Sequence, residues 1–225
     1  MAADRRKRAT RRAAAGLAAL TLASLAGCGP QESAQPASGF TESNPDGMHG
    51  AVLSEQYVVP ETTLTATDGS DYSLTEDTTA PLTLVFFGYT RCPDICQIVM
   101  ADMASALTRL DEEDRSKVEV LLVTSDPTRD DPAALREYLD RFNPEFEGLT
   151  GDLGRIVDVA NELGVAIEKG AKMPSGGYEV THGTQIVAID ERDRSPIVWT
   201  EGTSPAQLAE DLTALLDQQE SSPES

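Results

Sequence analysis

Residues 82–96 read LTLVFFGYTRCPDIC, and most of what can be inferred about the fold starts from them. Residues 82–87 form a nearly continuous apolar run, which is typical of a strand buried on both faces of a sheet. A helix is expected to follow from Pro93 to about Leu110, because apolar residues then recur at spacings of three and four. The turn between them is predicted to lie beyond the carboxyl end of a central strand, where α/β proteins bind ligands.

The flanking segments predict a mixed β-sheet with helices on both faces. Before the central run, β-favouring segments surround the turn Asp68-Gly69-Ser70, which predicts an N-terminal β-hairpin extension. After it, strands are expected at 118–123, 184–189 and 196–199, and helices at 132–142, 152–163 and 204–216. Residues 169–178 are expected to form a hairpin loop.

The N-terminus is predicted to be a lipoprotein-type signal peptide covering residues 1–27. A basic segment is followed by an apolar run at 13–26, and the sequence Leu-Ala-Gly ends immediately before Cys28. This ending resembles a bacterial lipobox. The resemblance implies cleavage before Cys28, lipidation of its thiol, and attachment of the protein to the extracytoplasmic face of the cell membrane.

Composition separates the remaining chain into three parts. Residues 28–49 are rich in small and polar side chains and are expected to be a disordered tether, residues 50–217 one folded domain, and residues 218–225 a disordered tail.

The full chain of 225 residues carries a net charge of −20. Residues 1–27 hold a net +5, so their removal leaves −25. A surface this acidic repels phosphates, and no nucleic-acid partner is expected.

The predicted chemistry centres on Cys92 and Cys96. If the thiol of Cys28 is lipidated, Cys92 and Cys96 are the only thiols left. Exported compartments are usually oxidising, so a pair of thiols there is expected to have a function. Their spacing places them about one helical turn apart, and the helix N-terminus is expected to favour their thiolate forms. Thiolates serve either redox exchange or soft-metal binding. An inert disulfide or two buried structural cysteines would be the alternative.

The motif Phe87-Gly88-Tyr89-Thr90-x-Cys92-Pro93-Asp94-x-Cys96 resembles the Sco/SenC family of thioredoxin-like copper proteins. Further pieces agree in order over roughly residues 50–217: SDPTRDDP at 125–132, GLTG at 148–151 and THG at 181–183. The resemblance implies a thioredoxin-like fold that binds copper, as Cu(I) or Cu(II), through Cys92, Cys96 and His182. Arg91, Gln97 and the two neighbours of His182 depart from the family pattern but leave the three ligand types intact.

The ligand set itself favours copper. His182 is one of only two histidines, and two sulfurs with one imidazole suit copper, whereas a structural zinc site needs a fourth ligand. We expect the two sulfurs and the imidazole to converge on one small exposed pocket.

Three functions are compatible with this pattern. The first is a membrane-anchored metallochaperone that helps to assemble the copper A centre of cytochrome c oxidase. Its partners would be the copper-bearing oxidase subunit and a copper donor protein or thiol reductant. The second is a thiol-disulfide oxidoreductase with Cys92 and Cys96 as its redox-active pair, acting on oxidase or other exported cysteines. The three intervening residues and the lack of a proline after His182 weigh against a general thioredoxin role. The third is a peroxidase-like or binding module.

Overall fold

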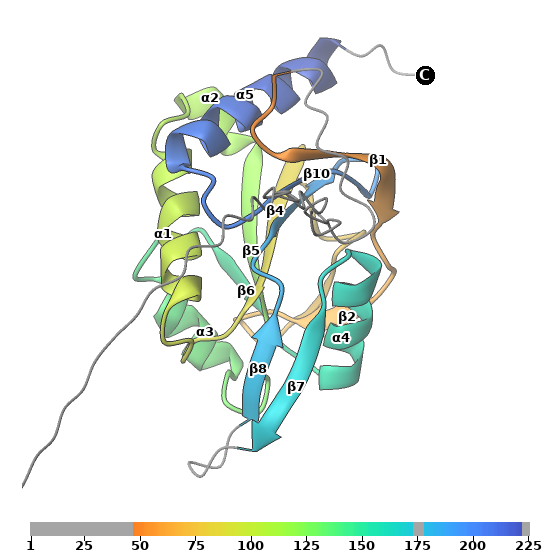
Figure 1. The fold of residues 1–225 in the computed structure, drawn as a ribbon, viewed down its shortest axis with the longest axis vertical. Coiled ribbons are helices and arrows are strands. Elements are labelled where there is room, and N and C mark those ends of the chain that lie inside the picture. Colours follow the sequence, from red (N-terminus) through yellow and green to blue (C-terminus); the bar gives the residue numbers. More distant parts are fainter. Residues whose placement is uncertain (1–46, 173–177, 222–225) are drawn as a thin grey trace, which may run out of the picture. The chain divides into compact units, whose positions relative to one another are not determined.

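The structure is a computed structural model that describes residues 47–172 and 178–221 (Figure 1). Its centre is a six-stranded mixed sheet. The strands lie in the order β1 (Ala51–Val58), β10 (Arg194–Trp199), β9 (Ile186–Asp190), β4 (Leu82–Gly88), β5 (Val118–Thr124) and β6 (Glu147–Leu149). β4, β5 and β6 are parallel. β9 and β10 run antiparallel to the neighbours on either side, and the edge strand β1 runs antiparallel to β10. The carboxyl ends of β4 and β5 therefore meet at one edge of the sheet.

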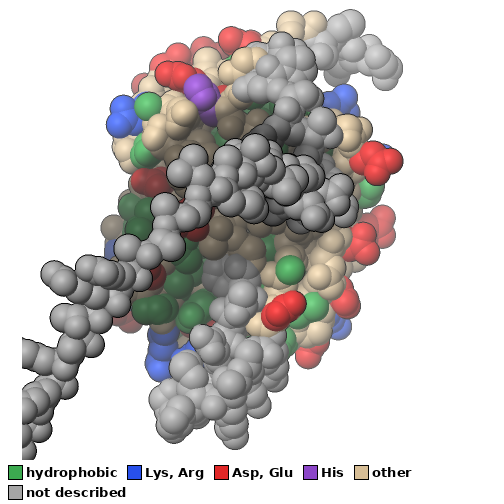
Figure 2. All heavy atoms as spheres, in the orientation of Figure 1, with side chains coloured by type: hydrophobic (Ala, Val, Ile, Leu, Met, Phe, Trp, Pro, Cys, Tyr) green, Lys and Arg blue, Asp and Glu red, His purple; other side chains and the backbone are tan. Residues whose placement is uncertain are grey.

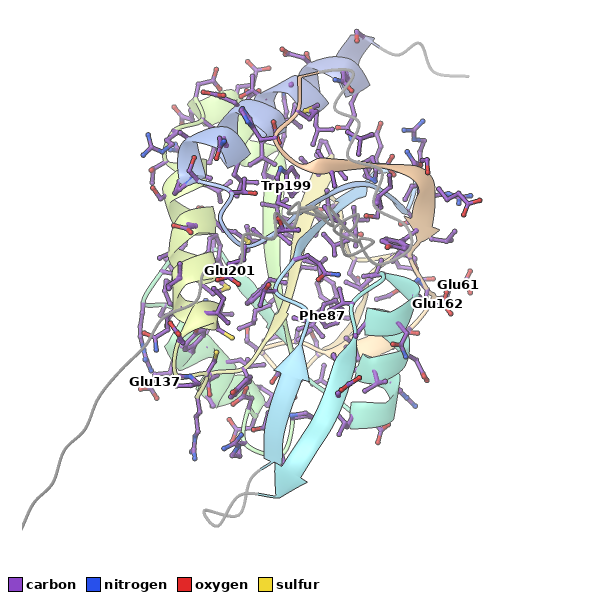
Figure 3. The ribbon with its side chains drawn as sticks, in the orientation of Figure 1. Glu61, Phe87, Glu137, Glu162, Trp199 and Glu201 are labelled. Carbon is purple, nitrogen blue, oxygen red and sulfur yellow. The ribbon has the colours of Figure 1, made fainter. Side chains whose placement is uncertain are left out.

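Side chains of β4 alternate between two apolar layers. Leu84 and Phe86 face the layer filled by α1 (Ile95–Leu107), α3 (Pro132–Leu139) and α5 (Pro205–Ser221). Val85 and Phe87 face the opposite layer. That layer is filled by α4 (Leu153–Glu162) and by the hairpin of β2 (Thr63–Thr65) and β3 (Asp71–Ser73). Phe87 and Trp199, labelled in Figure 3, are both fully buried.

This architecture confirms the predicted fold class, a thioredoxin-like mixed sheet flanked by helices with an N-terminal β-hairpin extension. Helix α1 begins at Ile95 rather than at Pro93, and its N-cap Asp94 makes no side-chain capping bond. The short strand β6 and the short helix α2 (Glu112–Ser116) were not expected. A strand of three residues has too few positions to show an alternating pattern.

A second hairpin joins β7 (Ile167–Lys172) to β8 (Tyr178–His182). The hairpin loop predicted at 169–178 is thus largely paired strand, and residues 173–177 lie outside the described residues. Glycine, alanine and lysine dominate 169–172, so cross-strand pairing rather than intrinsic propensity makes this segment a strand.

Both boundaries predicted for the domain lie inside packed structure. Met48 is buried in the core, and the backbone amides of His49 and Gly50 donate to the buried carboxylate of Asp211. The packed chain therefore begins before residue 50. At the other end α5 continues to Ser221, past the predicted limit at 217, because its last turns contact the loop before β4 and the end of α2.

The predicted signal peptide, most of the predicted tether, Cys28 and the end of the chain after Ser221 lie outside the described residues. Within residues 47–172 and 178–221, no helix has the length and apolar character that crossing a membrane requires.

Candidate metal centre

Cys92 and Cys96 lie in the turn that connects β4 to α1. Cys92 stands before the helix and Cys96 lies in its first turn, as the spacing predicted. The backbone amide of Cys96 donates to Cys92 Sγ at 3.4 Å, and the amide of Cys92 donates to the carbonyl of Tyr89 at 3.2 Å. Neither cysteine forms a disulfide bond. The turn therefore holds two sulfurs side by side, one of them solvated by a helix N-terminal amide.

Both sulfurs are buried, which corrects the expected exposed pocket. Cys92 is 6% exposed and Cys96 is not exposed at all. Burial raises the pKa of the Cys96 thiol well above its ordinary value, and its hydrogen bond with Cys92 raises that pKa further. The prediction that the helix N-terminus favours a thiolate is therefore wrong for Cys96, because desolvation outweighs the amide dipoles. A cation bound to the sulfur would offset this cost of burying a negative charge.

Asp130 anchors the loop that carries the cysteines. Its fully buried carboxylate accepts hydrogen bonds from the amide of Thr90 at 2.9 Å, the hydroxyl of Thr90 at 2.6 Å and the hydroxyl of Thr124 at 2.7 Å. Its backbone carbonyl accepts the hydroxyl of Thr150 at 2.9 Å. The carboxylate of Asp130 thus joins the cysteine loop to the end of β5, and its backbone carbonyl adds the end of β6. Since buried carboxylates need several donors, this arrangement leaves the loop little freedom.

A second set of contacts, made by Arg129, restrains the same loop. Arg129 pairs with Asp126, and its guanidinium lies 6.0 Å from the ring centroid of Tyr89. Burial raises the pKa of Tyr89, and the neighbouring cysteines raise it further. The amide of Ser125 donates to the carbonyl of Gly88 at 2.7 Å, which joins the ends of β4 and β5 beneath the loop.

Gly88 is required because the backbone passes directly under the sulfur centre. A Cβ at this position would lie 2.8 Å from the ring of Phe86 and 3.1 Å from Cys96 Sγ. Any larger residue would displace the sulfur or the ring.

His182 is placed by its backbone. It is the last residue of β8 and pairs with Ile167, while its side chain lies outside what the structure describes. Four residues later Ile186 opens β9 opposite Phe86, near the carboxyl end of β4. Four residues span at most about 14 Å. His182 and the cysteine loop therefore belong to the same edge of the sheet, although they are distant in sequence.

The two cysteines fit a thiophilic cation, because two soft sulfur donors share one turn of the chain. Among the side chains that the structure describes, no group of three His, Cys, Asp or Glu residues could hold a metal. The expected ligand set of Cys92, Cys96 and His182 stays a prediction.

Other sequence predictions have clear outcomes. Met100 and Met103 are fully buried core residues. His49, in the predicted tether, bonds Glu210 at 2.9 Å through Nε2. Asp130 lies in the motif at 125–132, but its anchoring role was not predicted from the sequence. Asp126 and Asp131 lie in the same polar run, so the pattern alone does not single out Asp130.

The six-stranded sheet and the cysteine pair beyond β4 define a thioredoxin-like protein with a paired-thiol site. The SCO1/SenC family model matches residues 52–217. The chain belongs to this family.

Known relatives agree with this assignment. A SCO2-like protein of Rickettsia conorii is 42% identical over 134 residues, which cover 58% of this chain and 64% of that protein. The structure of Bradyrhizobium japonicum ScoI with copper bound is similar to 72% of this chain and 98% of its own, with a TM-score of 0.61 and 30% identity. Apo Sco1 from Thermus thermophilus covers 75% of this chain and 96% of its own, with a TM-score of 0.67 and 28% identity.

The curated relatives are longer than the shared domain. The regions that match this chain cover between 44% and 67% of the length of these curated relatives. Copper-bound structures occur among the solved relatives, and the solved protein BsSco is a member of the Sco family of cytochrome c oxidase assembly proteins.

Proposed function

We propose that this protein is a membrane-anchored, extracytoplasmic copper metallochaperone. It holds copper through Cys92, Cys96 and His182 and delivers it to the copper A centre of cytochrome c oxidase. The partners are the oxidase subunit that carries this centre and a copper donor or thiol reductant. Family membership and the copper-bound relative support the metal and the assembly pathway.

One observation carries the proposal: two cysteines that form no disulfide lie in a single turn, and the amide of Cys96 donates to the sulfur of Cys92. A soft cation bound there removes both thiol protons and supplies the charge that burial otherwise makes unfavourable. Asp130 keeps the loop in place, so the two sulfurs need little rearrangement to bind. His182 completes the set from the same edge of the sheet.

Copper titration tests the ligand set. Reduced protein is titrated with Cu(I) against a competing chelator, alongside Cys92→Ser, Cys96→Ser, His182→Ala and His49→Ala. We expect one copper per chain in the wild type, loss of binding in both serine variants, and at least about tenfold weaker binding in His182→Ala. His49→Ala is the matched control, because it removes the other histidine and should leave the affinity unchanged.

Unchanged copper affinity in Cys92→Ser and Cys96→Ser would refute the site. If His182→Ala behaved like His49→Ala, the histidine would have no role as a ligand. Fast turnover of a disulfide substrate by a protein that binds no copper would favour the oxidoreductase function instead.

The lipid anchor is tested separately. We expect the full chain to sediment with membranes and Cys28→Ser to lose lipid labelling and membrane association. Equal membrane association of the two proteins would count against the lipoprotein anchor, without bearing on copper binding by the domain.

A further inference from the structure

Asp126 and Arg129 form an ion pair that is largely shielded from water. Their side chains are 8% and 17% exposed, and the backbone amide of Arg129 donates to the carbonyl of Asp126 at 3.0 Å. The amide of Asp126 in turn donates to the hydroxyl of Thr124, the last residue of β5. Removing two charges from water is unfavourable, and a shielded ion pair adds little stability over an apolar pair of similar size. Stability alone therefore does not account for this pair.

Arg129 reaches from the end of β5 to the residue that follows β4. Its guanidinium lies over the ring of Tyr89, 6.0 Å from the centroid, a distance typical of a cation–π contact. The ring of Tyr89 is half-buried and packs against the apolar cluster that contains Cys92 and Cys96. Because Asp126 fixes the guanidinium, the position of the ring is fixed as well.

The backbone of Tyr89 is directly bonded to the cysteine turn. Its carbonyl accepts the amide of Cys92 at 3.2 Å, and Cys92 Sγ accepts the amide of Cys96 at 3.4 Å. A rotation of Tyr89 would move this carbonyl and, through it, Cys92. Asp130 holds the next residue, Thr90, by separate hydrogen bonds. Arg129 and Asp130 therefore act on different residues of the same loop.

We propose that Arg129 is a positioning residue for the copper centre. Oriented by Asp126, it holds the ring of Tyr89 and so keeps the Tyr89 carbonyl where it fixes the amide of Cys92. The flat guanidinium can face the ring and pair with the carboxylate at once, which a lysine ammonium does less well. The role in copper binding rests on the proposed function, whereas the hold on Cys92 is a property of the metal-free fold.

The test uses variants at both ends of this contact. Arg129→Gln removes the charge and Arg129→Lys keeps it, while Tyr89→Leu removes the ring and Tyr89→Phe keeps it. The matched control is Arg192→Gln. Arg192 also bonds a buried carboxylate, that of Asp190 at 2.9 Å, but it does so beside Leu82 at the opposite end of β4.

Two sets of measurements are made on every variant. In the metal-free protein, hydrogen exchange is followed at the amide of Cys92 and at the amide of Leu208. The Leu208 amide donates to the carbonyl of Ser204 in α5 and reports opening of the fold away from the cysteine loop. In the loaded protein, the Cu(I) affinity and the sulfur-to-copper absorption band of the Cu(II) form are measured.

For Arg129→Gln we expect exchange at Cys92 to be about three- to tenfold faster, after correction for any change at Leu208. The Cu(I) affinity should fall by a similar factor and the absorption band should shift. Tyr89→Leu should reproduce these effects, and the double variant with Arg129→Gln should add little, because both changes break the same contact.

The conservative variants and the control should behave differently. Arg129→Lys should recover part of the loss, because it keeps the charge opposite Asp126. Tyr89→Phe should retain most of the wild-type exchange and affinity, because it keeps the aromatic face. Arg192→Gln should leave exchange at Cys92, the Cu(I) affinity and the spectrum unchanged.

Wild-type exchange at Cys92 in Arg129→Gln would overturn the inference. Equal acceleration at Cys92 and Leu208 would overturn it too, because the variant would have loosened the whole fold. Faster exchange at Cys92 with wild-type affinity and spectrum would exclude a role in the copper centre. If the wild type bound no copper, the proposed function would fail, whereas the exchange rates would still decide whether Arg129 holds Cys92.

Discussion

Cys96 shows at the residue scale how burial controls sulfur chemistry. Its folded-state pKa is raised, so above about pH 8.5 the folded chain retains a proton that the unfolded chain has lost. The free energy of unfolding must therefore fall as the pH rises, by up to about 1.4 kcal/mol per pH unit for this group. Tyr72 and Tyr138, whose pKa values are also raised, add to this loss above about pH 10.

We predict that urea unfolding of reduced, metal-free protein shows this loss from pH 8.5 to 10 and that Cys96→Ala removes most of it. Tyr72→Phe is the control, because it should change the pH dependence of the unfolding free energy only above about pH 10. A wild-type free energy that stays constant over this pH interval would contradict the prediction.

Asp130 is the residue on which the geometry of the cysteine loop depends most. Asp130→Ala leaves the amide and hydroxyl of Thr90 and the hydroxyl of Thr124 unpaired in the interior. We expect a loss of about 3 kcal/mol or more in unfolding free energy and weaker Cu(I) binding. Asp131→Ala, which removes only the N-cap of α3, should cost about 1 kcal/mol and leave Cu(I) affinity unchanged. Equal losses in the two variants would show that Asp130 has no special role.

At the scale of elements, the end of α4 depends on a left-handed residue. Gly164 has φ +70°, and a Cβ there would lie 2.3 Å from the ring of Tyr57. Gly69 has φ +86° in the β2–β3 turn, with open space around it. Alanine is thus strained at both positions but collides only at Gly164.

We predict that Gly69→Ala lowers the unfolding free energy by about 1 kcal/mol through backbone strain alone. Gly164→Ala should cost at least about 2 kcal/mol, because Tyr57 must also move. Urea titrations of the two variants give the difference. Equal losses of unfolding free energy in the two variants would mean that the ring of Tyr57 moves aside without measurable cost.

On the scale of the whole molecule, the buried carboxylate of Asp211 connects distant parts of the chain. It accepts the amides of His49 and Gly50 and, at 2.7 Å, the indole Nε1 of Trp199. It thus joins the start of β1, the end of β10 and α5. On the face shown in Figure 2, the visible acidic side chains are spread out rather than gathered in one patch. Asp211 differs from them because it is buried and its carboxylate accepts hydrogen bonds from three residues.

Asp211→Asn replaces an acceptor oxygen by an amide that faces donors. We expect a loss of about 2–4 kcal/mol and faster hydrogen exchange at residues 49–50. Glu210→Gln, which changes the exposed partner of His49, should cost no more than about 0.5 kcal/mol. Hydrogen exchange at 49–50 that matches wild type in Asp211→Asn would refute this connection.

Much of the fold could be predicted because periodicity is a local property. The apolar run at 82–87, the helix after it and the turn at Gly69 all appear in the structure near their expected positions. The limits of the domain could not be predicted, because Met48 and the last turns of α5 gain their order from partners distant in sequence. The polar strands β7 and β8 were not predicted for the same reason, because each is ordered by its pairing with the other.

The sequence alone was enough to place two cysteines about one turn apart after a buried strand, because residue spacing and the order of the elements are properties of the linear chain. Only the tertiary structure decided that Cys96 is buried, that Asp130 anchors its loop and that Arg129 lies over the ring of Tyr89. Desolvation and hydrogen-bond partnership depend on which segments meet in space, and a linear pattern does not contain that information.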